Sequence, residues 1–215
     1  MIAVLGLVFG TLFNQSIQDF LPNLAIGLIF WGFMSTVISE GCTGFTAAEG
    51  IILQVRMPLF THVARILWRN TIILGHNLLI LPLLFILLLK PVSLTVLLSI
   101  PGFILLIVNM SWVMLILATV CARFRDMTLI AQNAMQVFFY LTPIIWSAAL
   151  LPNRAGTYLL NLNPFYHLIN IVRDPLLGKF PNTVSWVFVT LLMVFGWGLT
   201  LPFFSQYRKR IPYWL

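Results

Sequence analysis

Polar side chains inside otherwise apolar segments are the residues of this sequence best placed to do chemistry. On one long apolar segment, Arg65, Arg69 and His76 fall within about 40° of one another in a helix, and Asn70 and Asn77 follow a neighbouring strip. Polar groups at membrane depth are costly, and they normally face protein or a wet cavity. The strip therefore indicates either a transport pathway that includes His76 and Asn77, or interhelical hydrogen bonds that only hold a bundle together.

A second polar stripe has a clearer pattern. Its members fall within about 80° on one helical face, and they are Gln132, Gln136, Tyr140, Pro143 and Ser147. Long hydrogen-bonding side chains on a helix that kinks at a proline suit a hydrated channel for a polyhydroxylated substrate. Packing accounts for the stripe equally well. Nearby, Trp146 either stacks on a sugar or, as is commoner for tryptophan, anchors the helix at the membrane interface.

No group of residues with a catalytic spacing is found in the sequence. The five acidic residues are dispersed, so buried metal or proton-transfer chemistry lacks its carboxylates. A phosphate-cradling G-x-x-x-x-G-K-[ST] loop is absent, so the chain is not expected to hydrolyse ATP itself. Cys42 and Cys121 have neither CxxC nor Cys/His spacing, which favours small buried hydrophobes over a disulfide or a metal site. We predict a non-catalytic chain that binds no metal and no cofactor of its own.

The composition identifies an integral membrane protein. Of 215 residues, 60% are hydrophobic and only 8% are charged, against about 25% charged in a typical soluble domain. Because a bilayer core needs about 20 apolar residues per helix, we predict an all-α polytopic protein. Its five full spans are expected at about 23–44, 65–89, 93–121, 127–150 and 184–204. An apolar fragment at 1–13 predicts half of a further span, left by a truncation or by a start site upstream of Met1.

The basic residues predict the orientation of these spans. Eight of the twelve gather on one side and four on the other, and an excess of Lys and Arg marks the cytoplasmic side. The eight are Arg56, Arg65, Arg69, Arg123, Arg125, Arg208, Lys209 and Arg210, and the four are Lys90, Arg154, Arg173 and Lys179. The tail 205–215 is therefore expected in the cytoplasm. Because these bases lie at span ends, the net charge of +7 does not indicate nucleic-acid binding.

Two links between spans have the pattern of short helices. In the inner link, 45–64, we expect a helix over about Ala47–Arg56 that Pro58 stops. It either lies on the membrane or docks in a groove on a cytoplasmic partner. In the outer link, 151–183, the stretch NPFYHLINIVRDPLLGKFPN predicts an amphipathic helix in the outer leaflet, with its histidine, asparagine and aspartate turned away from the apolar face. Pro164 starts this helix, and Pro175 with Gly178 breaks it.

Five stretches, in this order and spacing, carry a family resemblance. They are EGIILQVRMP (49–58), RILWRNTIILGHN (65–77), ARFRDMTLIAQNAMQVFFYLTPIIW (122–146), NPFYHLINIVRDPLLG (163–178) and YRKRIPYWL (207–215). Together they resemble the membrane subunits of ABC type-2 exporters that move polysaccharide or lipopolysaccharide O-antigen chains. The resemblance implies six spans per subunit in the bacterial inner membrane and a homodimer with the pathway at its interface. It also implies two copies of a separate ATP-binding subunit, which hold the ATP and Mg.

The resemblance also implies roles for individual residues. The inner link becomes a coupling helix that rests on the ATP-binding subunit, through Glu49, Gln54, Arg56, Met57 and Pro58. A turn at the cytoplasmic membrane surface contains Arg123, Arg125 and Asp126. The outer helices gate the exit, through Asn163, Pro164, Tyr166, His167 and Arg173. Arg173 would hold this gate through the neighbourhood of Asp174 or a lipid phosphate, although a helix that only anchors at the surface remains an alternative.

These observations predict the membrane subunit of an exporter for a lipid-linked polysaccharide. One alternative is a type-2 exporter of a drug or small lipid, which an apolar pathway would favour. Another is a membrane-embedded glycosyl or prenyl transferase, which needs clustered acidic metal ligands. A third is a purely structural membrane subunit. The front of the chain departs from the family pattern, since members begin with an interfacial helix and a complete first span.

Overall fold

The computed structural model describes Val4, Gly6 and residues 16–55, 57–91, 93–146, 154–180 and 182–215. In this part of the chain every regular element is a helix. Four segments are long and apolar enough to cross a membrane, and they are Gln18–Cys42, Leu59–Leu87, Leu94–Arg123 and Thr183–Tyr207. They confirm four of the five full spans that the sequence predicts. Apart from Val4 and Gly6, the predicted half span at 1–13 lies outside the described residues.

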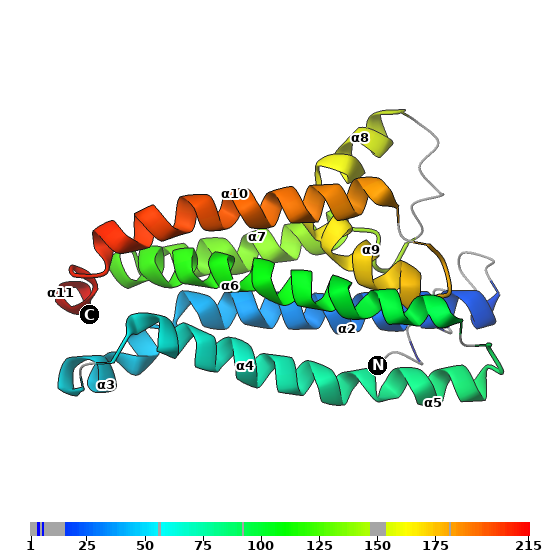
Figure 1. Ribbon diagram of the computed structural model, residues 1–215, viewed down its shortest axis with the longest axis horizontal. Coiled ribbons are helices and arrows are strands. Elements are labelled where there is room, and N and C mark those ends of the chain that lie inside the picture. The colour runs from blue at the N-terminus through cyan, green and yellow to red at the C-terminus, as the bar shows by residue number, and fades with distance from the viewer. Residues whose placement is uncertain are drawn as a thin grey trace.

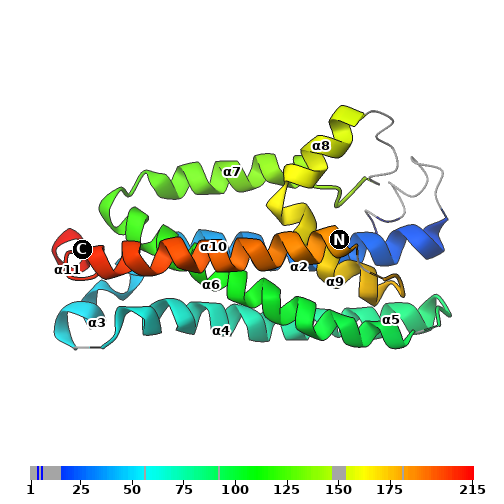
Figure 2. The same ribbon diagram turned by 45° about the horizontal axis from the view of Figure 1, so that its top comes forward.

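The long helices lie side by side along the longest axis of the molecule (Figure 1). They are α2 (Ile17–Cys42), α4 (Leu59–Leu78), α5 (Ile80–Leu87), α6 (Ser99–Arg123), α7 (Met127–Leu141) and α10 (Thr183–Tyr207), with η2 (Leu94–Leu98) leading into α6. α6 packs against α2, α4 and α10, so it lies at the centre of the bundle. Both views place α4 and α7 on different sides of α2 (Figures 1 and 2).

The core of the bundle forms where α2 meets α6. Phe30 and Met34 on α2, and Leu106 and Met114 on α6, are almost completely buried. Gly102 lets α6 come close to α9 (Pro164–Leu176), the helix that contains Ile171. Any Cβ at this position would lie 2.5 Å from the carbonyl oxygen of Ile171, so no larger residue fits without a shift. Apolar burial and close backbone approach together fix the helices against one another.

The predicted span 127–150 is not one continuous helix, and this expectation is wrong. α7 has 15 residues and ends at Leu141. Thr142 takes an extended backbone conformation (φ −92°, ψ 132°), because the residue before a proline is biased away from the helical region. Pro143 therefore follows the end of the helix and does not kink it. Residues 147–150, including Ser147, lie outside the described residues.

The short helices gather at the two ends of the bundle (Figure 1). At one end lie η1 (Thr46–Ala48), α3 (Glu49–Gln54) and α11 (Ile211–Trp214). At the other end lie α8 (Arg154–Leu162) and α9 (Pro164–Leu176). The segments that the sequence assigns to the inner side and to the outer side are thus found at opposite ends.

α9 is more deeply buried than an amphipathic surface helix. It contacts α2, α6 and α10, and its buried residues include His167 and Asn170 as well as Leu168 and Ile169. The sequence predicts an amphipathic helix in the outer leaflet with His167 and Asn170 away from its apolar face, but in the structure both of these polar residues are buried as well. Pro164 does occupy the first turn, as expected, and Pro175 lies inside the last turn of the helix.

Candidate functional site

α3 presents apolar side chains at the end of the bundle. Ile51, Leu53 and Val55 are each between 43% and 57% exposed, whereas Ile52 packs against the core. The predicted helix in this link is confirmed, but it ends at Gln54, because Val55 is extended. Exposed apolar residues on a short, anchored helix form a surface that a protein partner can cover.

The other residues predicted for coupling lie around this helix. Glu49 begins α3 and is half-buried, and Gln54, Met57 and Pro58 are exposed. Pro58 is the N-cap of α4, so it starts the next helix as well as following the previous one. Arg56 lies outside the described residues.

The turn between α6 and α7 lies beside this surface. Arg123 ends α6 and stacks over the rings of Phe124 and Trp214, at 5.2 Å and 5.4 Å from the ring centroids. Asp126 is the N-cap residue of α7 and makes no side-chain cap hydrogen bond. Arg125 and Glu49 line one cavity of about 520 Å³, together with Cys42 and Cys121. The structure thus brings the predicted coupling segment and the arginine turn together.

The polar strip on α4 has a partner that sequence reasoning missed. Glu40 on α2 accepts a hydrogen bond from the Asn70 side-chain amide and forms a 2.6 Å ion pair with Arg69. These residues hold α2 to α4, which favours the packing interpretation for this part of the strip. His76 and Asn77 lie one helical turn or more beyond Asn70 on α4, and both are exposed. His76 Nδ1 lies 2.9 Å from the Ile72 carbonyl oxygen of the same helix.

The stripe on α7 faces away from the rest of the chain. Gln132, Gln136 and Tyr140 are exposed, while Met135, on a neighbouring face of the helix, is buried. Because α4 and α7 lie on different sides of α2 (Figure 2), His76 and Asn77 do not join this stripe within one subunit. Pro143, by contrast, is buried.

The predicted gate residues form a hydrogen-bonded network that ties α9 to its surroundings. Asn163 accepts from the backbone N–H groups of Phe165 and Tyr166 through Oδ1, and its Nδ2 donates to Thr142 Oγ1 at 2.9 Å. The N-cap of α9 is therefore fixed to the segment that follows α7. Asparagine before a proline at N1 is a preferred helix start, so local sequence and long-range contact agree here.

His167 is 1% exposed and lies between α8 and α10. Its Nε2 lies 2.9 Å from the carbonyl oxygen of Asn161, which only accepts, so Nε2 carries the proton. Nδ1 lies 2.9 Å from Ser185 Oγ, within hydrogen-bond distance. Tyr166 is half-buried beside this ring. Both ring nitrogens are thus occupied, which gives His167 a structural position between three helices.

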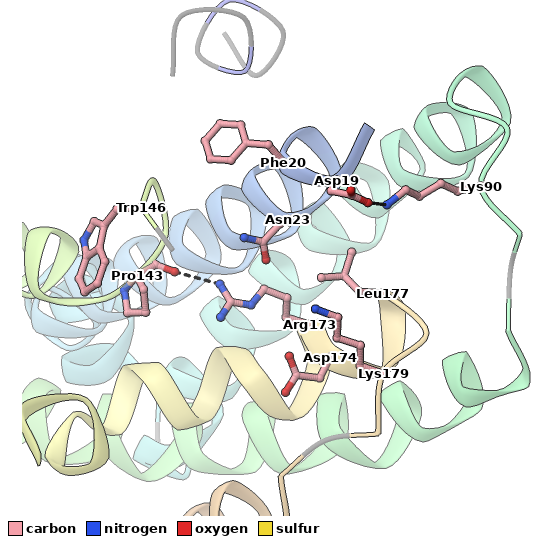
Figure 3. Close-up of a pocket in the computed structure, with 10 residues that line it drawn as sticks. All are labelled: Asp19, Phe20, Asn23, Lys90, Pro143, Trp146, Arg173, Asp174, Leu177 and Lys179. Carbon is pink, nitrogen blue, oxygen red and sulfur yellow. Dashed lines mark hydrogen bonds and ion pairs between the residues drawn. The ribbon is translucent and has the colours of Figure 1, made fainter. Parts of the chain in front are cut away.

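Arg173 is the buried cation of α9. Its guanidinium donates to the carbonyl oxygen of Pro143 at 2.9 Å and to Asn170 Oδ1 at 2.6 Å, so it joins α9 to the segment after α7 (Figure 3). Burial raises the pKa of Asp174, while nearby Arg173 and Lys179 oppose this shift. Trp146 lies on the same side of the molecule and donates from Nε1 to the Tyr140 carbonyl oxygen at 3.2 Å.

A helical bundle with four apolar membrane-length helices and short helices at both ends defines a membrane domain. The family model of the ABC-2 type transporter matches residues 1–177, and the chain belongs to this family. The chain is 26% identical over 170 residues to the O-antigen export system permease protein RfbA of Myxococcus xanthus. That match covers 76% of this chain and 63% of the relative's length.

Proposed function

We propose that this chain is the membrane-spanning subunit of an ATP-driven exporter that moves a polysaccharide, such as a lipid-linked O-antigen or capsule chain, across the bacterial inner membrane. The similarity to an O-antigen export permease is the observation that carries this substrate class. The exposed Gln132, Gln136 and Tyr140 on α7 add to it. Polar side chains that face away from their own subunit need a partner surface or water at membrane depth.

The working assembly in this proposal is a homodimer with two ATP-binding subunits. The ATP-binding subunits rest against α3, through Glu49 to Pro58, and the C-terminal tail lies on the same cytoplasmic side. The basic residues near this end support the orientation. The exposed apolar side chains of Ile51, Leu53 and Val55 support the docking.

Transport in this scheme uses exchangeable hydrogen bonds. ATP binding by the partner moves α3, and the movement widens a pathway between the two copies of α7. Gln132, Gln136 and Tyr140 then contact sugar hydroxyls one after another. Since each such hydrogen bond contributes only about 1 kcal/mol net, the polymer is bound weakly enough to slide along the pathway. At the far end, Asn163, Pro164, Tyr166, His167 and Arg173 form the exit gate.

The test replaces the stripe and measures polymer at the cell surface. In a strain that depends on this chain, the double variant Gln132→Leu/Gln136→Leu is expected to reduce surface polysaccharide on the order of tenfold, because two hydrogen-bonding groups are lost. Expression, membrane insertion and binding of the ATP-binding subunit should stay unchanged. Surface polysaccharide is measured by immunoblotting or mass spectrometry of the released glycans.

Gln206→Leu is the matched control. Gln206 is an exposed amide on α10, which packs mainly on α6 and α9 and does not contribute to the stripe on α7. This variant should export normally. Normal polysaccharide in the double variant would contradict the pathway role and would assign Gln132 and Gln136 to packing.

A further inference from the structure

A polar cavity of about 390 Å³ lies at the end of the bundle opposite α3 and α11. Side chains from the start of α2, from the segments after α5 and α7, and from α9 with the turn after it line this cavity (Figure 3). Its charged residues are Asp19, Lys90, Arg173, Asp174 and Lys179. Three cations and two acids therefore meet in one small space.

Once the closest ion pair is set aside, the two remaining cations, Arg173 and Lys179, face a single acid. Lys90 Nζ and Asp19 Oδ1 form an ion pair at 2.6 Å, so these two charges neutralise each other. Among the described residues Arg173 forms no ion pair, and the oxygens that accept its hydrogen bonds are neutral. Burial raises the pKa of Asp174, while Arg173 and Lys179 oppose this shift, so Asp174 is the acid that lies nearest to these two cations. Lys179, which lines the cavity and is exposed to solvent, adds a further cation.

The position of the cavity fits the depth of lipid headgroups. Asp19 is the second residue of the span Gln18–Cys42, and Lys90 comes shortly after the end of Leu59–Leu87. Span ends lie where the hydrocarbon core gives way to the headgroup region. Trp146, half-buried in the cavity wall, is of the residue type enriched at this boundary.

We propose that this cavity binds a phosphate group, presented by a lipid headgroup or as the free ion, between Arg173 and Lys179. A guanidinium with fixed orientation offers a fork of N–H donors that matches phosphate oxygens, and a lysine adds a point charge. Figure 3 shows Asn23 directed toward the same space as Arg173, where its amide offers a further donor. Phosphate would supply a directly bound anion, which the Arg173 guanidinium lacks among the described residues. The site shares Arg173 with the proposed exit gate, but its test measures binding to the purified chain and does not depend on export.

Binding to the purified full chain in a neutral maltoside detergent tests this inference. The probes are dihexanoyl phosphatidylglycerol, inorganic phosphate and dihexanoylglycerol. Dihexanoylglycerol has the same acyl chains as the phospholipid but no phosphate. Binding is followed by native mass spectrometry and by titrated thermal shift. Lys179→Gln should weaken phosphatidylglycerol binding about threefold, as expected for an exposed charge. Arg173→Lys should weaken it about tenfold, because the fork is lost while the charge remains. Lys209→Gln, an exposed lysine at the other end, is the control and should bind like the parent.

The three probes separate the sources of the phosphate. Tight binding of phosphatidylglycerol alone supports a lipid headgroup, and comparable binding of inorganic phosphate supports the free ion. Equal binding of dihexanoylglycerol would overturn the proposal, because the chains and not the phosphate would then be bound. Binding by Lys179→Gln that equals the parent's would also overturn it, and this exposed position leaves folding intact even if Arg173→Lys does not.

Discussion

At the scale of single residues, Glu40 is the side chain on which the contact between α2 and α4 depends. Its carboxylate receives the Asn70 amide, which is 4% exposed, and the Arg69 guanidinium, which is largely exposed. The two contacts contribute different amounts to the free energy of unfolding. An ion pair with an exposed arginine contributes little. The Asn70 Nδ2 also donates to the Ile66 carbonyl oxygen, so loss of Glu40 leaves one of its two N–H groups unpaired, and a buried polar group without its partner costs about 1–3 kcal/mol.

Glu40→Ala is therefore expected to lower the free energy of unfolding by about 1–3 kcal/mol. Thermal unfolding of the purified chain in detergent measures the effect. Glu49→Ala, which removes a half-buried carboxylate on α3, is the control and should stay within about 0.5 kcal/mol. The double variant Glu40→Leu/Asn70→Leu should recover most of the loss, since neither hydrogen-bonding partner is then left unpaired. A double variant less stable than Glu40→Ala would contradict this account.

At the scale of helices, the sequence predicts what depends on local pattern and misses what depends on distant contacts. Four long apolar runs have no stable alternative to a membrane helix, and all four are found. The start of α9 is also predictable, because Asn163 and Pro164 act on the adjacent backbone. The burial of His167 is not, since its partner Ser185 belongs to another helix. For the same reason no sequence pattern pairs Glu40 with Asn70, thirty residues away.

α3 gives the prediction that belongs to this scale. Leu53→Arg should reduce copurification of the ATP-binding subunit on the order of tenfold. Leu53 is 57% exposed, and a buried apolar contact contributes about 1.5–3 kcal/mol when a partner covers it. Pull-down from solubilised membranes, quantified against the permease band, measures the effect. Phe180→Arg is the matched control, because Phe180 is 81% exposed at the opposite end of the bundle. Equal loss in both variants would argue for general destabilisation and against docking at α3.

At the scale of the whole molecule, α7 is the helix whose polar face a single subunit leaves uncovered. Its 15 residues span only about 22 Å at 1.5 Å per residue, which is less than a hydrocarbon core of about 30 Å. It packs mainly on α2, and Gln132 and Gln136 point away from the chain. A short helix with two outward amides is a poor surface for lipid. A second copy, with water between the two stripes, would cover it.

Cross-linking between copies tests this assembly directly. In a chain with Cys42 and Cys121 replaced by alanine, Gln136→Cys should give a covalent dimer with a short bis-maleimide in native membranes. Leu191→Cys, on the exposed face of α10, should give at least about fivefold less, because lipid suits an apolar helix face. The cross-linked dimer is quantified on gels at several expression levels of the tagged chain. Cross-links from random collisions fall as the amount of chain in the membrane is lowered, whereas those of a specific dimer persist. A dimer formed preferentially through Leu191→Cys would move the interface to α10, and it would leave the amides of α7 to a different partner.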